Sequence, residues 1–168
     1  MLHFHSLPIW VTWRFHERDG KRTKVPYQSD GTRYASSTNP STWDTYENVN
    51  AQPNKDGIGI VFEQENRIVG VDFDHIIDPD TQRPYTHLPE GLSTFLDQAN
   101  TYVEYSPSKT GLHALFQLTD DLDLIANKFS FPEDPNEAAI EVYTHGRYFT
   151  FTEDKRPNAK ANPRLITP

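Results

Sequence analysis

The strongest constraint on the fold lies in residues 69–74, where apolar and polar side chains alternate in the order Val-Gly-Val-Asp-Phe-Asp. Successive side chains of a β-strand point to opposite faces, so this pattern predicts a strand with one apolar and one polar face. The apolar residues at 69, 71 and 73 belong against a core. Gly70, Asp72 and Asp74 lie on the other face, with the two carboxylates about 7 Å apart at their roots.

Two carboxylates on one strand face repel each other unless a cation lies between them. Gly70 leaves room for a ligand beside them, and the preceding apolar run offers Gly57 and Gly59 on one face. An Asp-x-Asp pair by itself is also explained by a strand that ends at the surface. The pair therefore needs support from other segments.

Short apolar runs dominate the rest of the chain and predict an α/β fold with most strands in the second half. The link at 63–66 predicts a hairpin between the runs 58–62 and 67–73. Helices are expected at 40–51 and 89–100. The other expected strands span residues 8–15, 23–27, 102–106, 112–118, 139–144 and 147–152.

The chain of 168 residues suits one domain, and its lack of cysteine excludes disulfides, thiolate zinc sites and cysteine nucleophiles. No apolar run approaches the roughly 18 residues that a membrane span needs. The first five residues lack the basic start and apolar run of a signal peptide. We therefore expect a cytoplasmic protein with no membrane partner.

The net charge of −8 is unevenly distributed. Residues 155–168 contain four basic and no acidic residues, whereas residues 1–154 contain 12 basic and 24 acidic ones. We interpret 1–154 as the domain and 155–168 as a basic linker or tail that leads to further domains of a longer protein. The acidic domain argues against a protein that coats a phosphate backbone, but it suits a site that handles phosphates through divalent metals.

A second candidate segment runs from Glu104 to His113, from one expected strand through a turn into the next. Ser108, Lys109 and Thr110 place hydroxyls, an ammonium and backbone N–H groups at one turn, which suits a phosphate. His113 faces away from the apolar row at 112, 114, 116 and 118, so it could donate to the same phosphate. A plain hairpin turn with a half-exposed histidine explains the segment equally well.

A third segment places Glu141 on an apolar strand and Arg147 at the start of the returning strand. The guanidinium of Arg147 could grip a triphosphate from there. The alternative is a cross-strand ion pair of little energetic value. Taken together, the three segments offer three carboxylates for two divalent metals and several phosphate donors, which is the inventory that nucleotidyl transfer requires.

The order Asp-x-Asp, then Ser-x-x-Gly-x-His, then a carboxylate on an apolar strand resembles the archaeo-eukaryotic primase superfamily. The chain looks most like the primase–polymerase (PrimPol) domains of phage and plasmid replication proteins. Further support comes from Trp13-Arg14, Lys24-Val25-Pro26 and residues 39–43, so the resemblance covers about residues 8 to 152. It implies an α+β catalytic core of two parts, an N-terminal α/β unit packed on an RRM-like unit with the active site in the cleft.

The resemblance also implies the roles of individual residues. Asp72, Asp74 and Glu141 would bind Mg²⁺ or Mn²⁺, and no zinc is expected. The phosphates of the incoming nucleotide would be contacted by Ser108, Lys109, Thr110, His113, Arg147 and Lys24. Lys109 departs from the glycine that relatives often have at its position, which leaves the geometry of the loop open.

The leading hypothesis is a template-directed nucleotidyltransferase, a DNA primase or DNA polymerase of phage or plasmid replication. Its partners would be a primer–template or single-stranded template, dNTP or NTP, and a helicase on the same or another chain. Two alternatives remain: a metal-dependent nuclease, and a non-catalytic RRM-like module that binds nucleic acid through Tyr148, Phe149 and Phe151. A labelled primer–template separates the three by extension, degradation or retardation.

Overall fold

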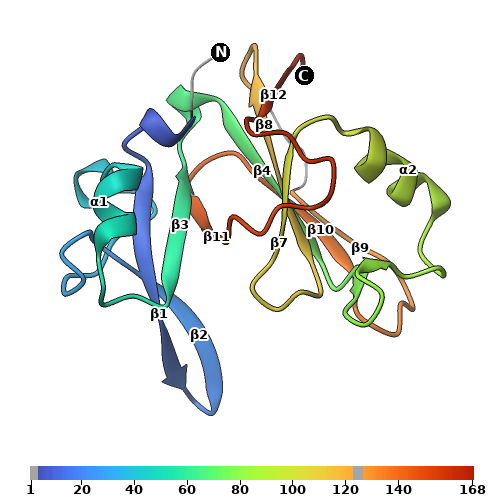
Figure 1. Cartoon of the computed structure of the whole chain (residues 1–168), viewed down its shortest axis with the longest axis horizontal. Coiled ribbons are helices and arrows are strands. Elements are labelled where there is room, and N and C mark those ends of the chain that lie inside the picture. Colours follow the sequence, from blue (N-terminus) through green and yellow to red (C-terminus); the bar gives the residue numbers. More distant parts are fainter. Residues whose placement is uncertain (1–3, 123–126) are drawn as a thin grey trace. The chain divides into compact units, whose positions relative to one another are not determined.

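The computed structural model describes residues 4–122 and 127–168 and divides them into two compact units. The first unit takes the chain up to Glu65 and adds His145–Phe151. The second unit takes Asn66–Thr144 and Thr152–Pro168. Figure 1 labels the sheet and the α-helix that belong to each unit.

The first unit contains an antiparallel sheet of four strands in the order β11-β3-β1-β2. Three short helices accompany it: η1 (Phe4–Ser6), η2 (Pro40–Thr42) and α1 (Tyr46–Ala51). The strands are β1 (Trp10–Arg18), β2 (Lys21–Tyr27), β3 (Gly57–Phe62) and β11 (Arg147–Phe151).

Aromatic packing holds the first unit together. Trp10 is fully buried, and the centroid of its ring lies 4.9 Å from that of Phe151 on β11. Phe4 contacts Phe151 at 5.8 Å, edge to face, which is a favourable geometry for aromatic rings. The N-terminal turn and the C-terminal strand of this unit therefore share one core.

The second unit is built on a six-stranded sheet in the order β12-β8-β4-β10-β9. Strand β7 pairs with the first half of β8, and β12 pairs in parallel with its second half. The short pair β5–β6 and the helix α2 complete the unit, and the 3-10 helix η3 spans the change from the first unit to the second. Their bounds are η3 (Gln64–Asn66), β4 (Ile68–Asp74), β5 (Ile77–Asp78), β6 (Arg83–Pro84), α2 (Glu90–Gln98), β7 (Tyr102–Tyr105), β8 (Leu112–Leu118), β9 (Lys128–Ser130), β10 (Ala139–Tyr143) and β12 (Arg164–Ile166).

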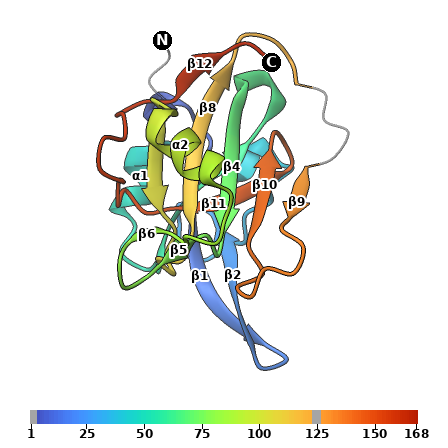
Figure 2. The same cartoon turned by 90° about the vertical axis from the view of Figure 1, so that its right-hand side faces the viewer.

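Helix α2 covers one face of this sheet (Figure 2). Its Leu92 and Leu96 pack into a core that includes Phe73 of β4 and Leu112 of β8. The apolar residues of each strand occupy alternate positions, so the intervening polar residues point to the opposite face. The alternation predicted for residues 69–74 is therefore confirmed, with its apolar side chains on the face toward the core.

The expected hairpin between 58–62 and 67–73 is wrong, because β3 and β4 belong to different sheets. Both edges of β3 are occupied, by β1 and β11, and both edges of β4 are occupied, by β8 and β10. The connection turns through η3 and through Arg67, whose φ of 54° lies in the left-handed region. The sequence pattern identified the two strands but not their partners.

The helix expected at 40–51 is interrupted. Its first turn is the 3-10 helix η2, and α1 begins only at Tyr46, after Thr45 accepts a hydrogen bond from the backbone N–H of Asn48. Between them, Asp44 exchanges two backbone hydrogen bonds with Trp10, at 3.0 and 2.9 Å. That bridge holds the chain in an extended conformation and prevents one continuous helix.

Residues 155–168, interpreted above as a linker or tail, are part of the second unit. The backbone N–H of Arg156 donates to Val103 and that of Lys160 donates to Thr101, so the segment runs beside β7. It ends as β12, whose Leu165 pairs with Gln117 of β8. Three consecutive residues of a Pro- and Asn-rich segment gave too short a pattern to predict a strand.

None of the helices in the described ranges combines the length and the apolar character that crossing a membrane requires.

Gly111 should tolerate no side chain, whereas Gly91 should. A Cβ at Gly111 would lie 2.5 Å from the backbone oxygen of Phe73, while a Cβ at Gly91 meets nothing within 4 Å. We expect Gly111→Ala to destabilise the protein by about 1–3 kcal/mol through overpacking. Gly91→Ala, inside α2, should be neutral or stabilise by up to about 1 kcal/mol. Urea unfolding of both variants measures this, and equal midpoints would contradict the strand contact at Gly111.

Candidate functional site

Five polar side chains form a row across the sheet of the second unit. Glu104 of β7 pairs with His113 of β8, His113 with Asp72 of β4, Asp72 with Glu141 of β10, and Glu141 with Lys128 of β9. Residues that pair directly in antiparallel strands point to the same face. We call these five residues the polar row, and they lie on the face opposite α2.

His113 is held between two carboxylates. Its Nδ1 lies 3.2 Å from Oε1 of Glu104, and its Nε2 lies 3.6 Å from Oδ1 of Asp72. The imidazole is 4% exposed, so neither contact is diluted by bulk water. A carboxylate oxygen only accepts, which makes Nδ1 the donor toward Glu104 and leaves Nε2 directed at Asp72.

Glu104 is fully buried and its two oxygens accept several hydrogen bonds. The hydroxyl of Tyr102 donates at 2.7 Å, and the backbone N–H groups of Thr152 and Glu153 donate at 3.0 and 2.9 Å. With His113, four groups therefore converge on this one carboxylate. Such a fully bonded carboxylate is rigid, so it fixes the orientation of the histidine ring.

Glu141 and Lys128 form the other end of the polar row. The ammonium of Lys128 lies 2.7 Å from Oε1 of Glu141, and the hydroxyl of Tyr143 donates to Oε2 at 2.9 Å. The hydrogen bond and the charge of Glu141 raise the pKa of the Lys128 ammonium, and the charges of Asp74 and Asp72 add to the rise. One ammonium therefore lies in the combined field of the three carboxylates.

The three carboxylates predicted to bind metal are placed by the register of β4 and β10. Glu141 lies directly opposite Asp72, whereas Asp74 lies opposite Ala139, two residues further along β4. Over residues 4–122 and 127–168, no three acidic or imidazole side chains stand at the separations of a preformed metal site. Glu141 instead has Lys128 as its cationic partner, on the same face.

The turn between β7 and β8 contains the residues predicted to contact phosphates. The hydroxyl of Ser108 lies 3.1 Å from that of Ser106 and 2.8 Å from that of Thr110. Lys109 has φ = 65°, the left-handed conformation that glycine adopts most easily, at the position where a glycine was expected from the resemblance. Its ammonium pairs with the carboxylate of Asp154.

Arg147 and Lys24 belong to the first unit, at the start of β11 and within β2. The returning strand expected to bring Arg147 beside Glu141 is not a partner of β10, because β11 pairs with β3 and β10 pairs with β4 and β9. The strands that carry Glu141 and Arg147 are therefore not paired with each other. The hydroxyl of Tyr148 donates to the backbone oxygen of Lys24 at 2.7 Å.

Two members of the polar row were not assigned a role from the sequence. Glu104 had a usable signal, because it is the one charged residue of a strand whose neighbours at 103 and 105 face the core. Lys128 had none, because β9 has three exposed residues without an apolar pattern. Only the pairing of β9 with β10 places the lysine beside Glu141.

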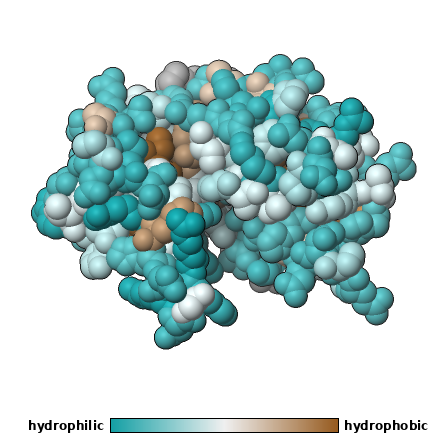
Figure 3. Space-filling model, turned by 60° about the horizontal axis from the view of Figure 1, so that its bottom comes forward, coloured by the Kyte–Doolittle hydropathy of each residue, from teal (hydrophilic) through white to brown (hydrophobic). Residues whose placement is uncertain are grey.

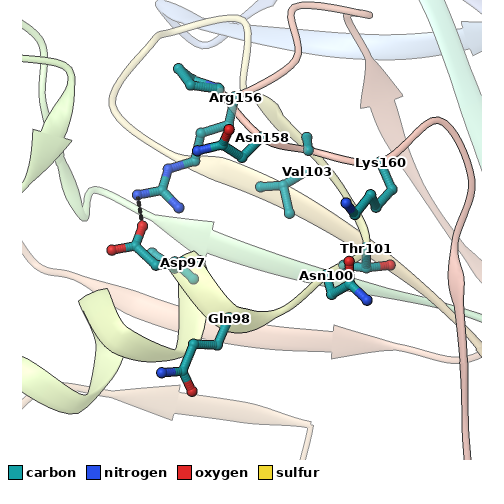
Figure 4. Close-up of a pocket in the computed structure, with 11 residues that line it drawn as sticks. Asp97, Gln98, Asn100, Thr101, Val103, Arg156, Asn158 and Lys160 are labelled. Carbon is teal, nitrogen blue, oxygen red and sulfur yellow. Dashed lines mark hydrogen bonds and ion pairs between the residues drawn. The ribbon is translucent and has the colours of Figure 1, made fainter.

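A pocket of about 640 Å³ lies elsewhere in the second unit, between the end of α2 and residues 156–160 (Figure 4). Arg156 pairs there with Asp97 at 2.8 Å, and Arg164 donates to the backbone oxygen of Ala99. Helix α2 has no basic residue in its own last turn, so these guanidinium groups supply the positive charge that a helix C-terminus favours. No member of the polar row lines this pocket, and the opposite charges of Asp97 and Arg156 are paired with each other.

No family model matches the chain. Over 147 residues the chain is 33% identical to a protein of Nitratiruptor phage NrS-1 described as a DNA primase-polymerase. The match covers 85% of this chain and 19% of the phage protein, so the chain spans about a fifth of the length of that relative. The chain is thus related to a primase-polymerase, and the match is longer than either unit alone.

Removing the Glu104 carboxylate should destabilise the second unit strongly. In Glu104→Ala, the buried ring of His113 and two backbone N–H groups lose their acceptor, so we expect a loss of about 3 kcal/mol or more in the free energy of unfolding. Tyr102→Phe is the matched control, because it removes one donor and leaves the carboxylate bonded, at about 1 kcal/mol. Urea unfolding compares the two, and equal losses would contradict the central role of Glu104.

Proposed function

We propose that this chain carries the nucleotidyl-transfer site of a DNA primase-polymerase, which adds nucleotides to a primer end on a DNA template. The observation that carries the proposal is the register that places Glu141, Asp72 and His113 side by side on one polar sheet face. The relationship to the phage primase-polymerase supports the same reaction class. The identity of the reaction rests on these two observations together.

The carboxylates fit a divalent cation by their chemistry. Asp72, Asp74 and Glu141 offer only oxygen donors, which are the ligands that Mg²⁺ and Mn²⁺ prefer. The ammonium of Lys128 already occupies their shared field, which supports a cation-binding role for this face. When bound, divalent cations would activate the primer hydroxyl and stabilise the pyrophosphate leaving group.

The chain's own residues would divide the remaining work. His113, held at Nδ1 by Glu104, directs Nε2 toward Asp72. In the imidazolium form, in which both ring nitrogens carry a proton, Nε2 would donate to a phosphate oxygen of the incoming nucleotide beside Asp72. The hydroxyls of Ser108 and Thr110 and the backbone of the turn at Lys109 would contact the same phosphates. Lys24 and Arg147, in the first unit, are further candidates for phosphate contacts.

The decisive experiment replaces Asp72 and Asp74 by Asn and measures primer extension with dNTP and Mg²⁺ or Mn²⁺. We expect extension to vanish, because a neutral amide is a poor ligand for a hard divalent ion. Binding of a primer–template without metal should stay level or increase, since two repulsive charges are gone. The control, Asp120→Asn with Asp121→Asn, removes the same charge from an exposed loop and should extend normally.

The outcomes of this experiment also separate the alternatives. Degradation of DNA without added nucleotides that is lost in the Asp72 and Asp74 variant would favour a nuclease. Retardation without extension in the unaltered protein would favour a binding module. Substantial extension by the variant, with its fold intact by circular dichroism, would refute the assignment of the two aspartates.

Lys128 should compete with the divalent cation for the carboxylates. Lys128→Met keeps most of the side-chain volume and removes the ammonium that lies 2.7 Å from Glu141. Because the lysine is about half exposed, we expect a modest rise in Mn²⁺ affinity, about two- to fivefold. Titration of free Mn²⁺ by electron paramagnetic resonance measures this without any turnover. Lys160→Met is the charge-matched control, and an unchanged affinity in Lys128→Met would contradict the shared cation position.

A further inference from the structure

The hairpin of β1 and β2 extends beyond the sheet of the first unit. Strand β3 pairs only with Trp10–Trp13 of β1, so residues 14–24 continue as a two-stranded ribbon (Figures 1 and 2). The side chains become exposed toward its tip, and Glu17–Lys24 are all exposed. A ribbon without a core of its own gains little stability from burial. Its sequence is therefore free to serve a surface function.

The ribbon concentrates positive charge in an acidic protein. Five of the 16 basic residues lie within residues 14–24, together with only two acidic residues, whereas the whole chain has a net charge of −8. In the part of the chain that the structure describes, Arg18 and Lys21 form no ion pair. These two cations lie opposite each other across the ribbon at its tip. They remain available to an anionic ligand.

Strand alternation separates the ribbon into two different faces. One face carries Glu17 beside Arg22. These two residues line a pocket that also includes Asp56. The other face, which we call the tyrosine face, carries no acidic residue on either strand. It consists of Arg14, His16, Arg18, Lys21, Tyr27 and, through a bridge to Tyr27, Tyr34.

The rings of the tyrosine face form a connected platform. The centroid of Tyr34 lies 4.9 Å from that of Tyr27 and 6.2 Å from that of His16. The guanidinium of Arg14 stacks over Tyr27 at 3.9 Å and donates to the backbone oxygen of Gly31. Tyr27 is buried beneath these contacts, whereas Tyr34 is 61% exposed. The platform thus presents one exposed ring, that of Tyr34, which packs against the buried ring of Tyr27.

The acidic residue of the loop that carries Tyr34, Asp30, is paired with a cation of the same loop. Asp30 accepts from the backbone N–H groups of Thr32 and Arg33 and pairs with the Arg33 guanidinium at 2.6 Å. These contacts lower the pKa of the Asp30 carboxyl, so it keeps its charge but shares it with a cation. The tyrosine face therefore stays positive overall.

We propose that the tyrosine face binds single-stranded DNA, with phosphates at Arg18 and Lys21 and an unpaired base stacked on Tyr34. Cations that follow a backbone and an exposed ring that accepts any base are the features of single-strand recognition. A duplex hides the faces of its bases, so it could use the cations but not Tyr34. The choice of DNA as the strand rests on the proposed function.

Another explanation of the charge is protection of an edge strand. Strand β2 is the edge of its sheet, and lysine or arginine on such a strand prevents pairing with other chains. That role needs neither an exposed tyrosine nor a difference between the two faces. Figure 3 shows one face of the molecule, on which hydrophilic residues predominate and the apolar areas are small.

The test measures binding of a fluorescent oligothymidylate of about 20 nucleotides by anisotropy, with EDTA and without nucleotides. We expect Tyr34→Ala to lower the affinity about tenfold, and Tyr34→Phe, which keeps the ring, to bind normally. Lys21→Gln and Arg18→Gln should each reduce the slope of log affinity against log salt by about 0.7. Arg22→Gln, the adjacent residue on the opposite face, is the matched control and should keep the slope.

Three results would overturn the proposal. These are unchanged binding by Tyr34→Ala, equal losses in Lys21→Gln and Arg22→Gln, and equal effects of Tyr34→Ala on single-stranded and duplex DNA. The Asp72 and Asp74 variant should bind the oligonucleotide normally. Failure of single-strand binding is thus separate from failure of the proposed function, which is measured by extension at saturating primer–template.

Discussion

The register of β7, β8, β4, β10 and β9 is the constraint on which the candidate site depends. A shift of one residue in β7, β8, β4 or β10 would move its polar residue toward the α2 core and an apolar residue onto the polar face, whereas β9, whose residues are exposed, takes its register from β10. The core residues Phe73, Leu112 and Val103 therefore select the register that aligns the polar row. The packing of apolar side chains on one face of the sheet therefore determines which polar side chains are adjacent on the other face. This coupling explains why Gly111 matters: it permits the close approach of β8 to β4 just before His113.

The same alternation explains which parts of the fold the sequence could predict. Leu112–Leu118 was predicted with its observed bounds, and α2 and β10 within a few residues, because each has a regular pattern. Strand partners were not predictable, since an apolar run such as Ile58–Phe62 is compatible with a core in either sheet. The result was a false hairpin to 67–73, and the strand that begins at Arg147 pairs with β3 rather than with β10. Strands with two or three residues, such as β9, carry too little pattern to be recognised.

The predicted site residues also divide into those whose position the sequence could predict and those whose position it could not. Asp72, His113 and Glu141 are adjacent because each alternates with core residues on a strand of one sheet. Ser108 and Thr110 lie in the turn between β7 and β8 of that sheet, so their position could be predicted from their closeness in the sequence to these two strands. Lys24 and Arg147 depended on the arrangement of the chain as a whole, which no local pattern contains. Glu104 could have been recognised as a lone carboxylate on a core strand, whereas Lys128 depended on strand pairing.

Positive charge in this acidic chain has three different settings, and each has a different physical consequence. At the end of α2, Arg156 and Arg164 bond to a carboxylate and to a backbone oxygen, so their charge serves the fold rather than a ligand. In the polar row, Lys128 compensates carboxylates that would otherwise repel one another. On the ribbon, Arg18 and Lys21 have neither kind of partner among the described residues. The C-terminal segment 155–168 was interpreted as a basic tail because its four cations are accompanied by no acidic residue in the sequence. In the folded chain, however, the cations best suited to a nucleic-acid phosphate are those that the fold leaves without a carboxylate, at the tip of β1 and β2.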